Sequence, residues 1–551
     1  MPPPETNVAA EAASARPRGR ALPGGWRAAA AVAALAVILV IVIVVIAAGG
    51  SSEPPPATGA AALVPSDALL YVHLSTDPAR PEVRRVVRLL DGLPDHGDAL
   101  LALVQRIVDV VGGSTGTDYR ADIRPWLGRE AAFALLNTTG GSAGSITILD
   151  VRNRSHALAF IKQQGGQPLP AVDGAPAYQY PTGAELAFAG RYLLVGTDPD
   201  VRTALEVWHG KLASLATNGT YRRATADAPP GRVLDAYAPA AGVLRLLDSR
   251  QGFLGALGAL ISPPSLLGTE LTVSPESPGL IVHIHDVLDR ATAAADTKRL
   301  APFSPSLASV LPSGSTLMID ARSLAAVAPI ALAAMGKIGL YGQVPDLLHR
   351  LGTALTGAGV NVPGFLALFK GETAVALASG SGAPALVFVT RTSHEQAARV
   401  TLANIEPALA QLFSAGGTGG GQEPEMSAVP TGGVTANQVL LGPGLQVDFA
   451  VFKGLIVVAT SARGVGDVAA RVGELDHASD FSAVLGNHPD QVTSLGFATF
   501  SQLLNLGGQS SLAQTAGYRS LQPDLQRIRS VGLDSTRGEE DTTAELFLQI
   551  S

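Results

Sequence analysis

Hydrophobic residues are distributed in two different ways along this chain. From Ala28 to Ala48, no charged or polar side chain interrupts the apolar run. Beyond residue 60, short runs rich in Val, Ile, Leu, Phe and Tyr alternate with turn-forming Gly, Pro, Asn and Asp. The first pattern has the length of a helix that crosses a bilayer, whereas the second is typical of β-strands.

Arginines indicate which side of the membrane each end occupies. Arg16, Arg18, Arg20 and Arg27 precede the apolar run, and no Lys or Arg follows it until Arg80. Because positive residues stay on the cytoplasmic side, we expect a single-pass cell-membrane protein with a cytoplasmic N-terminus and an extracytoplasmic bulk. A cleaved signal peptide and a buried core helix are the alternatives, and the small residues after residue 46 keep cleavage open.

The segments that flank the apolar run predict no regular structure. Residues 1–27 combine Pro, Gly and Arg, which predicts a disordered cytoplasmic tail. Residues 49–62 form a spacer rich in Pro, Gly and Ser, and its proline triplet favours an extended, semi-rigid chain. We therefore expect the globular part to begin near residue 63, slightly away from the membrane.

The remainder of the chain contains segments that resemble one another in pairs. VPSDALLYVHLS from Val64 resembles LPSGSTLMIDARS from Leu311, and WLGREAAFALL from Trp126 resembles LFKGETAVALA from Leu368. Further pairs follow in the same order. Self-similarity in a constant order predicts a tandem duplication, with a first unit at residues 63–300 and a second at residues 301–551.

Each predicted unit combines strands with interspersed helices. Two pairs of predicted strands flank short turns, NTTGGSAG in the first unit and SGSGA in the second, which is the pattern of antiparallel hairpins. Helical periodicity occurs at residues 81–90, 99–111, 155–162 and 199–208. We predict the α+β class: a tandem duplication of a mainly antiparallel sheet-plus-helices unit, preceded by one transmembrane helix. The sequence leaves open whether the two units form separate lobes or one continuous sheet.

Composition narrows the functional classes. Charged residues make up 15% and hydrophobic residues 47% of the chain, so it can bury a large core. The net charge of −7, with no basic cluster beyond the N-terminal tail, argues against a nucleic-acid partner. The chain has no cysteine, which excludes disulfides, thiol catalysis and cysteine-ligated zinc.

Two glutamates occur at matching strand starts. Glu130 lies beside Gly128, and Glu372 lies beside Gly371. A carboxylate in this position can serve as an acid–base group, which makes both glutamates candidate catalytic residues. A surface carboxylate at the entry of a strand is the simpler interpretation and the one we favour.

Two histidines are the candidate metal ligands. His283 and His285 alternate along a predicted strand, so both imidazoles lie on one face, a spacing that metal sites use. The matching positions in the second unit, Leu548 and Ile550, are apolar, which favours an ordinary packed or edge face. No P-loop, dinucleotide-binding fingerprint, zincin motif or EF-hand occurs, so we predict no cofactor.

Three further patterns have simple structural explanations. Ser155–His156 and Ser393–His394 suggest a nucleophile–base pair, but adjacent residues of a helix do not face each other, so we interpret each Ser as a helix cap. GGSAG at residues 140–144 matches the G-x-S-x-G pattern but lies between two strands, which indicates a loop. The apolar, Gly-rich residues 252–268 and 327–340 predict core helices or the lining of a hydrophobic cavity.

Several of these segments together resemble a known bacterial family. The VPSDALLYVHLS opening, the LGREAAFAL and KGETAVAL strands, and the YLLVGTD and LIVVATS strands are similar to the domain of unknown function 3352. The similarity extends from Val64 to the C-terminus. It implies an uncharacterised, membrane-anchored envelope protein, and it supplies no functional residue.

These observations predict an extracytoplasmic binding or scaffold protein of the bacterial cell envelope, with an envelope protein or a lipid as its partner. One alternative is a tethered carrier of lipid or another hydrophobic ligand, suggested by the apolar Gly-rich segments. The other is an envelope hydrolase that uses Glu130 and Glu372, or a metal at His283 and His285.

Overall fold

The computed structural model of the chain describes residues 56–85, 119–137, 144–243, 265–276, 279–297, 301–322, 368, 370–378, 385–403, 425–442, 445–499 and 528–550. The predicted tail at residues 1–27 and the predicted transmembrane segment at residues 28–48 lie outside these ranges. Within the ranges, no helix is both long and apolar enough to cross a membrane.

The described residues form 20 strands. The first ten are β1 (Leu70–Ser75), β2 (Leu127–Leu136), β3 (Gly144–Val151), β4 (Gln167–Val172), β5 (Ala175–Gln179), β6 (Glu185–Ala189), β7 (Tyr192–Gly196), β8 (Leu234–Pro239), β9 (Leu266–Glu276) and β10 (Gly279–Leu288). The last ten are β11 (Ser315–Arg322), β12 (Glu372–Ala378), β13 (Ala385–Arg391), β14 (Glu425–Thr431), β15 (Val434–Gly442), β16 (Leu445–Phe452), β17 (Leu455–Ala459), β18 (Ser494–Thr499), β19 (Ile528–Arg537) and β20 (Asp541–Ile550).

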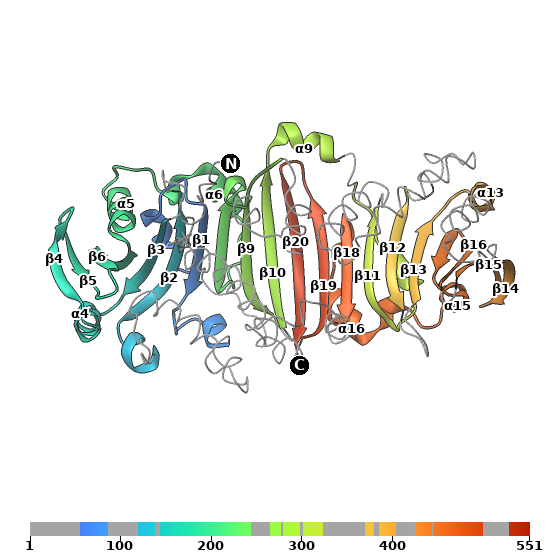
Figure 1. Cartoon of the computed structure of the whole chain (residues 1–551), viewed down its shortest axis with the longest axis horizontal. Coiled ribbons are helices and arrows are strands. Elements are labelled where there is room, and N and C mark those ends of the chain that lie inside the picture. The colour runs from blue at the N-terminus through green and yellow to red at the C-terminus, as the bar shows by residue number, and fades with distance from the viewer. Residues whose placement is uncertain are drawn as a thin grey trace, which may run out of the picture.

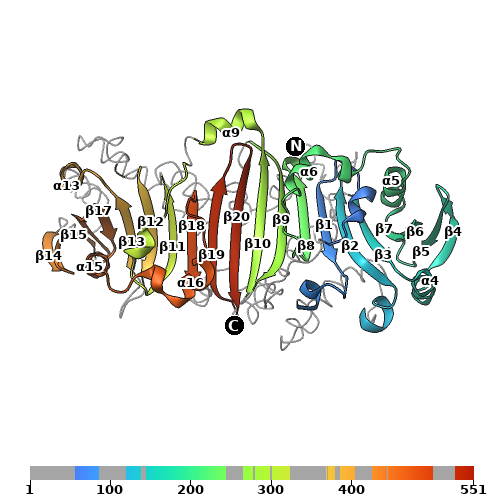
Figure 2. The same ribbon diagram turned by 180° about the vertical axis from the view of Figure 1, so that it is seen from behind.

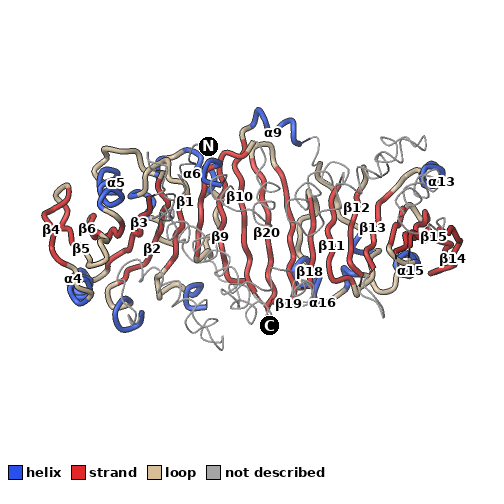
Figure 3. Tube along the Cα trace, viewed as in Figure 1, coloured by secondary structure: helices blue, strands red, loops and turns tan. Residues whose placement is uncertain are grey.

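These strands form one antiparallel sheet. They lie side by side along the long axis of the molecule, from β4 at one end to β14 at the other (Figures 1 and 3). Their pairing gives the order β4-β5-β6-β7-β3-β2-β1-β8-β9-β10-β20-β19-β18-β11-β12-β13-β17-β16-β15-β14. Read from its outer end inward, each half of the sheet has the same order: β14 corresponds to β4, β15 to β5, and so on to β20 and β10.

Few helices accompany this sheet in the described ranges. The α-helices are α4 (Arg154–Gln163), α5 (Asp198–Trp208), α6 (Gly219–Ala224), α9 (Arg290–Thr297), α13 (Glu395–Ala403), α15 (Ala462–Ala470) and α16 (Ser479–Leu485). Short helical turns are η1 (Gly59–Leu63), η2 (Tyr119–Ile123), η3 (Leu215–Thr217), η4 (Leu307–Ser309) and η5 (Leu475–His477). The helices predicted at residues 155–162 and 199–208 are present as α4 and α5, and the predicted hairpins are present as β2–β3 and β12–β13.

The predicted α+β class, with its tandem sheet-plus-helices units, is wrong. The described residues are mainly β-strand, and the two predicted units share one sheet because the final strand, β20, pairs with β10 through nine residue pairs from Gly279 to Val287. The view from behind shows the same unbroken series of strands (Figure 2). The two backbones approach so closely that a Cβ on Gly279 would lie 1.8 Å from the carbonyl oxygen of Leu548. Each long strand would otherwise leave an unpaired edge, and pairing the two removes both edges.

Proline marks both outer ends of the sheet. β4 contains Pro168 and Pro170, and β14 contains Pro430. Proline has no N–H to donate, so it disfavours the addition of another strand. Both outer strands of the described sheet therefore carry a residue that protects an edge against pairing.

Hydrophobic cores form on both faces of the sheet. One core joins α5 and α6 to β1, β3 and β7, and its second-half counterpart packs α15 and α16 against β11, β13 and β18. We call the face that carries these four helices the helical face. On the opposite face, Phe160 and Ile161 of α4 pack against Leu149, Leu186 and Leu193. The period of two along each strand sends alternate side chains to the two cores.

Candidate functional site

A row of polar side chains crosses the middle of the helical face. Residues that are directly opposite one another in an antiparallel pair lie on the same face. Following the register from β1 through β8, β9, β10, β20, β19 and β18 to β11 gives His73, Asp235, Thr272, His283, Glu545, Asp534, Leu495 and Asp320. We call these residues the polar row. Seven of the eight are polar, and five of these are buried: His73, Asp235, Thr272, Asp534 and Asp320.

The β1 end of the polar row is a buried series of ionisable groups. His73 is fully buried, and its Nδ1 lies 2.7 Å from Oδ2 of Asp235. The second carboxylate oxygen of Asp235 accepts a hydrogen bond from Nε of Arg232. Burial acts to raise the pKa of Asp235, but the hydrogen bond from His73 and the charges of His73 and Arg232 outweigh it and lower the pKa.

Glu130 lies next to His73 and binds the start of η1. Its side chain is fully buried and accepts hydrogen bonds from the backbone N–H groups of Gly59 and Ala60, both at 3.2 Å. It also accepts from the Tyr192 hydroxyl at 2.6 Å and from the Arg191 guanidinium at 2.9 Å. The interpretation of Glu130 as a surface carboxylate is wrong, since η1 covers it.

Glu372 occupies the corresponding position beside η4. It accepts hydrogen bonds from the backbone N–H groups of Ser306 and Leu307 and from the Ser306 hydroxyl. Nε of Arg391 donates to it at 3.0 Å. Both glutamates, the candidate catalytic residues of the sequence, therefore bind the start of a helical turn, a position that the turn's free N–H groups favour.

Asp320 ends the polar row on β11, beside Glu372. Its burial raises the pKa of the carboxyl to about 8, and the nearby charge of Glu372 contributes in the same direction. Close to the other end of the row, burial raises the pKa of Glu270 to about 8, with a further contribution from Asp235. Neither carboxylate oxygen of Glu270 has a hydrogen-bond partner among the described residues.

We expect Asp320→Asn to stabilise the protein at alkaline pH. The folded state keeps a proton on Asp320 that the unfolded chain releases near pH 4, so this group lowers stability as the pH rises from about 4 to about 8. Asn has no proton to lose. Near pH 9 the free energy of unfolding of the variant should therefore be higher than that of wild type by at least about 1.4 kcal/mol, the equivalent of one pKa unit. Urea unfolding across this range measures the difference, with the exposed Asp490→Asn as control. An Asp320→Asn variant with the pH dependence of wild type would contradict the prediction.

The centre of the polar row contains the two candidate metal ligands. Nδ1 of His283 lies 3.3 Å from Oε1 of Glu545, and the hydrogen bond between them lowers the pKa of Glu545. Nδ1 of His285 lies 2.8 Å from the carbonyl oxygen of Ala224 in α6, and its Nε2 lies 3.7 Å from Oδ2 of Asp541. The sequence placed both histidines on one face correctly. It gave no indication of the β20 carboxylates, which are far away along the chain.

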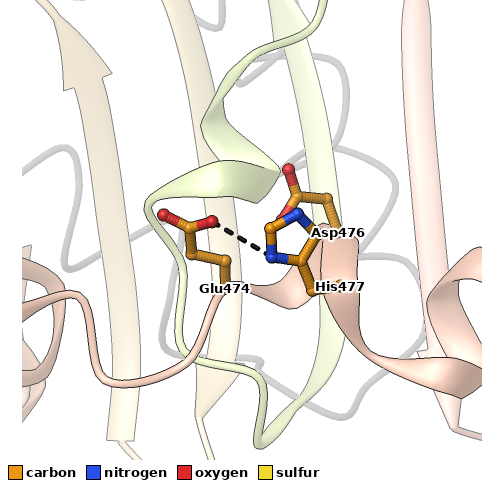
Figure 4. A group of neighbouring side chains, drawn as sticks. All are labelled: Glu474, Asp476 and His477. Atoms are coloured by element: carbon orange, nitrogen blue, oxygen red, sulfur yellow. Dashed lines mark ion pairs between the residues drawn. The ribbon is translucent and has the colours of Figure 1, made fainter.

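One group of three potential metal ligands lies close together among the described residues. The ligand atoms of Glu474, Asp476 and His477 are within 4.8 Å of one another (Figure 4). His477 is 77% exposed, its Nδ1 lies 3.2 Å from Glu474, and Arg471 lies 3.7 Å from the same glutamate. Glu474 already has Arg471 as a cationic partner, and His477 lies largely in solvent, so we assign no metal to this group.

The remaining sequence candidates have local roles or lie outside the described ranges. The cap of α4 is Asn153, which accepts from the N–H of His156, so the interpretation of Ser155 as the cap is wrong. The Ser393 hydroxyl does lie 2.8 Å from Nδ1 of His394, because these residues precede α13 and are not in helical geometry. Residues 140–143, 252–264 and 327–340, which carry most of the G-x-S-x-G pattern and of the apolar Gly-rich segments, are outside the described ranges.

Comparison with known families assigns the chain to a family. A family model described as "Protein of unknown function (DUF3352)" matches residues 28–550. The chain belongs to the DUF3352 family. No curated protein matches this DUF3352 protein. Among solved structures it is similar to crystal forms III and I of TP0453, at 12% and 10% identity. These matches cover 45% and 47% of this chain and 86% and 89% of the other, each with a TM-score of 0.24, which is too low to carry an argument.

Proposed function

We propose that this DUF3352 protein is a binding protein of the bacterial cell envelope. Residues 28–48 anchor it in the cell membrane, with the N-terminus cytoplasmic and the sheet outside the cytoplasm. Its partner binds the helical face at the central strands β9, β10, β20 and β19.

The polar row is the observation that supports this proposal. Placing ionisable groups in a sheet face costs free energy unless they are paired, so their concentration there points to function. The row is buried at His73 and at Asp320, whereas His283 and Glu545 between them are partly exposed. A partner can therefore reach the row at its centre, between α6 and α16.

The position of η1 supports the proposed tether. Seven residues, 49–55, separate the proposed anchor from Pro56, where the described structure begins, and a fully extended chain of that length spans roughly 25 Å. Glu130 then fixes η1 against β2. The tether would therefore keep the sheet close to the membrane surface.

In-cell photocrosslinking tests the proposed binding surface. A photoreactive amino acid in place of Thr543, which faces His285 across the strand pair, is expected to give a discrete crosslinked species in the full-length protein. The same amino acid in place of the remote, exposed Leu212 is the control. The species should disappear when His283 and Glu545 are both changed to Ala. Equal crosslinking from both positions, or crosslinking that ignores the double substitution, would reject this surface.

Protease treatment of intact spheroplasts tests the proposed topology. External protease is expected to digest the bulk of the chain and to leave a short fragment that contains residues 1–48. A cytoplasmic protein serves as the control for spheroplast integrity. Full protection of the chain would overturn the proposed orientation.

A further inference from the structure

We propose that the strand pair β10–β20 binds one divalent transition-metal ion of the Zn²⁺ type through His283, His285 and the carboxylates of Asp541 and Glu545. The inference rests on the proposed function, because it names a ligand for the centre of the same surface. His283, His285, Asp541 and Glu545 all lie on the helical face of two neighbouring strands. Imidazole nitrogens and carboxylate oxygens are ligands that Zn²⁺ accepts.

The contact of His285 with α6 prepares its other nitrogen for a metal. A carbonyl oxygen only accepts, so the 2.8 Å contact with Ala224 requires Nδ1 of His285 to carry the hydrogen. In the neutral ring the lone pair is then on Nε2. Metal-binding histidines usually have this arrangement, in which the second nitrogen donates to a backbone carbonyl or a carboxylate.

In the neutral ring, Nε2 is an acceptor that lies near a second acceptor, the carboxylate of Asp541. The two atoms are 3.7 Å apart, which is too long for a hydrogen bond, and without a positive charge between them they repel. Two ligands at 2.0–2.2 Å from a tetrahedral Zn²⁺ lie roughly 3.3–3.6 Å from each other. The His285–Asp541 distance is close to that range. The hydrogen bond between His283 and Glu545 holds their two atoms 3.3 Å apart, so a metal ion between them would replace the proton of that bond.

The surroundings add negative charge and spare acceptors. Asp534, which lies opposite Glu545, is 8% exposed and has no hydrogen bond to another described residue. On the other side of His283, the buried hydroxyl of Thr272 also lacks a partner among the described residues. A cation in this region would satisfy groups that the described structure leaves unpaired.

An ion from solvent can reach the proposed ligands, but their side chains must move to bind it. The side chain of His285 is 12% exposed and that of Asp541 is 49% exposed, so solvent reaches the carboxylate while the imidazole is shielded. The ligand atoms of three groups are not yet within 4.8 Å of one another here, unlike at Glu474, Asp476 and His477. Binding therefore requires the side chain of His283 or Glu545 to rotate toward His285.

Metal titration of the full-length protein in detergent tests the inference. After removal of metal by a chelator, Zn²⁺ binding is measured by competition with Co²⁺, whose visible absorption reports tetrahedral nitrogen and oxygen ligands. Wild type is expected to bind one equivalent, and His285→Gln and Asp541→Asn should each weaken binding by at least about tenfold. His477→Gln is the matched control, since it removes the histidine of the surface group, and it should bind as wild type does.

A second measurement separates loss of metal from loss of fold. Zn²⁺ should raise the Tm of wild type and of His477→Gln, and should leave the Tm of a folded His285→Gln unchanged. Absence of stoichiometric Zn²⁺ binding, or its loss in His477→Gln, overturns the metal site. If wild type binds no Zn²⁺ while the crosslink from position 543 persists, the metal inference fails and the proposed binding function stands. Loss of that crosslink with Zn²⁺ binding intact rejects the proposed partner surface alone.

Discussion

Glu130→Ala is expected to lower the free energy of unfolding by about 3–5 kcal/mol, the usual cost of breaking a buried charged network by removing one partner. The substitution leaves the N–H groups of Gly59 and Ala60 and the Tyr192 hydroxyl without their acceptor. Arg191 keeps its contacts with Asp150 and Tyr192, and η1 loses the carboxylate that binds its first N–H groups.

Urea unfolding of the full-length protein measures this effect, and Glu276→Ala, at the exposed end of β9, is the control. Glu130→Gln keeps the side-chain volume and one acceptor oxygen, so its free energy of unfolding should lie between those of wild type and Glu130→Ala. A Glu130→Ala variant as stable as Glu276→Ala would show that the buried network contributes nothing.

Asp235→Asn is expected to lower the free energy of unfolding by about 1.5–3 kcal/mol at neutral pH, the range for a hydrogen bond to a charged group. The folded state lowers the pKa of Asp235, through the bonds with His73 and Arg232 that overcome burial. A lowered pKa stabilises the folded protein above the unfolded value of about 4, and this stability is lost as the pH falls through the lower, folded value.

The difference between wild type and Asp235→Asn should therefore be constant near neutral pH and shrink in acid, below about pH 4. Thermal unfolding at a series of pH values measures it, with the exposed Asp227→Asn as control. A stability difference between wild type and Asp235→Asn that grows in acid would show that the charge of Asp235 is not what stabilises the folded state.

The local structure of this protein could be predicted from its sequence, whereas the joining of its strands could not. The helices α4 and α5 and the two hairpins follow from local periodicity and turn residues. The β10–β20 pair joins His283 to Glu545 across 262 positions, and alternation within each strand is the same whether the strands meet or stay apart. The sequence therefore could not decide whether the two predicted units share one sheet or form two separate lobes.

Apart from His283, the members of the polar row were missed for a related reason. The polar row takes one residue from each of eight strands, and each strand by itself shows only a polar residue at alternate positions, which is also the pattern of a solvent-facing sheet. One local signal was available at Glu130. A Cβ on Gly128 would lie 2.2 Å from Oδ2 of Asp150, so the glycine makes room for the carboxylate that pairs with Arg191 beside Glu130.

The arrangement of strands across the long axis gives the molecule a mechanical polarity. The backbone hydrogen bonds between strands run along that axis, so the strand pairs are connected in series (Figure 1). Tension on the two ends acts equally on every pair, and the weakest pair separates first. The β5–β6 pair, near the β4 end, has three matched residue pairs, against nine in β10–β20. A stretched molecule would therefore part near that end, and its central histidines and carboxylates would stay joined.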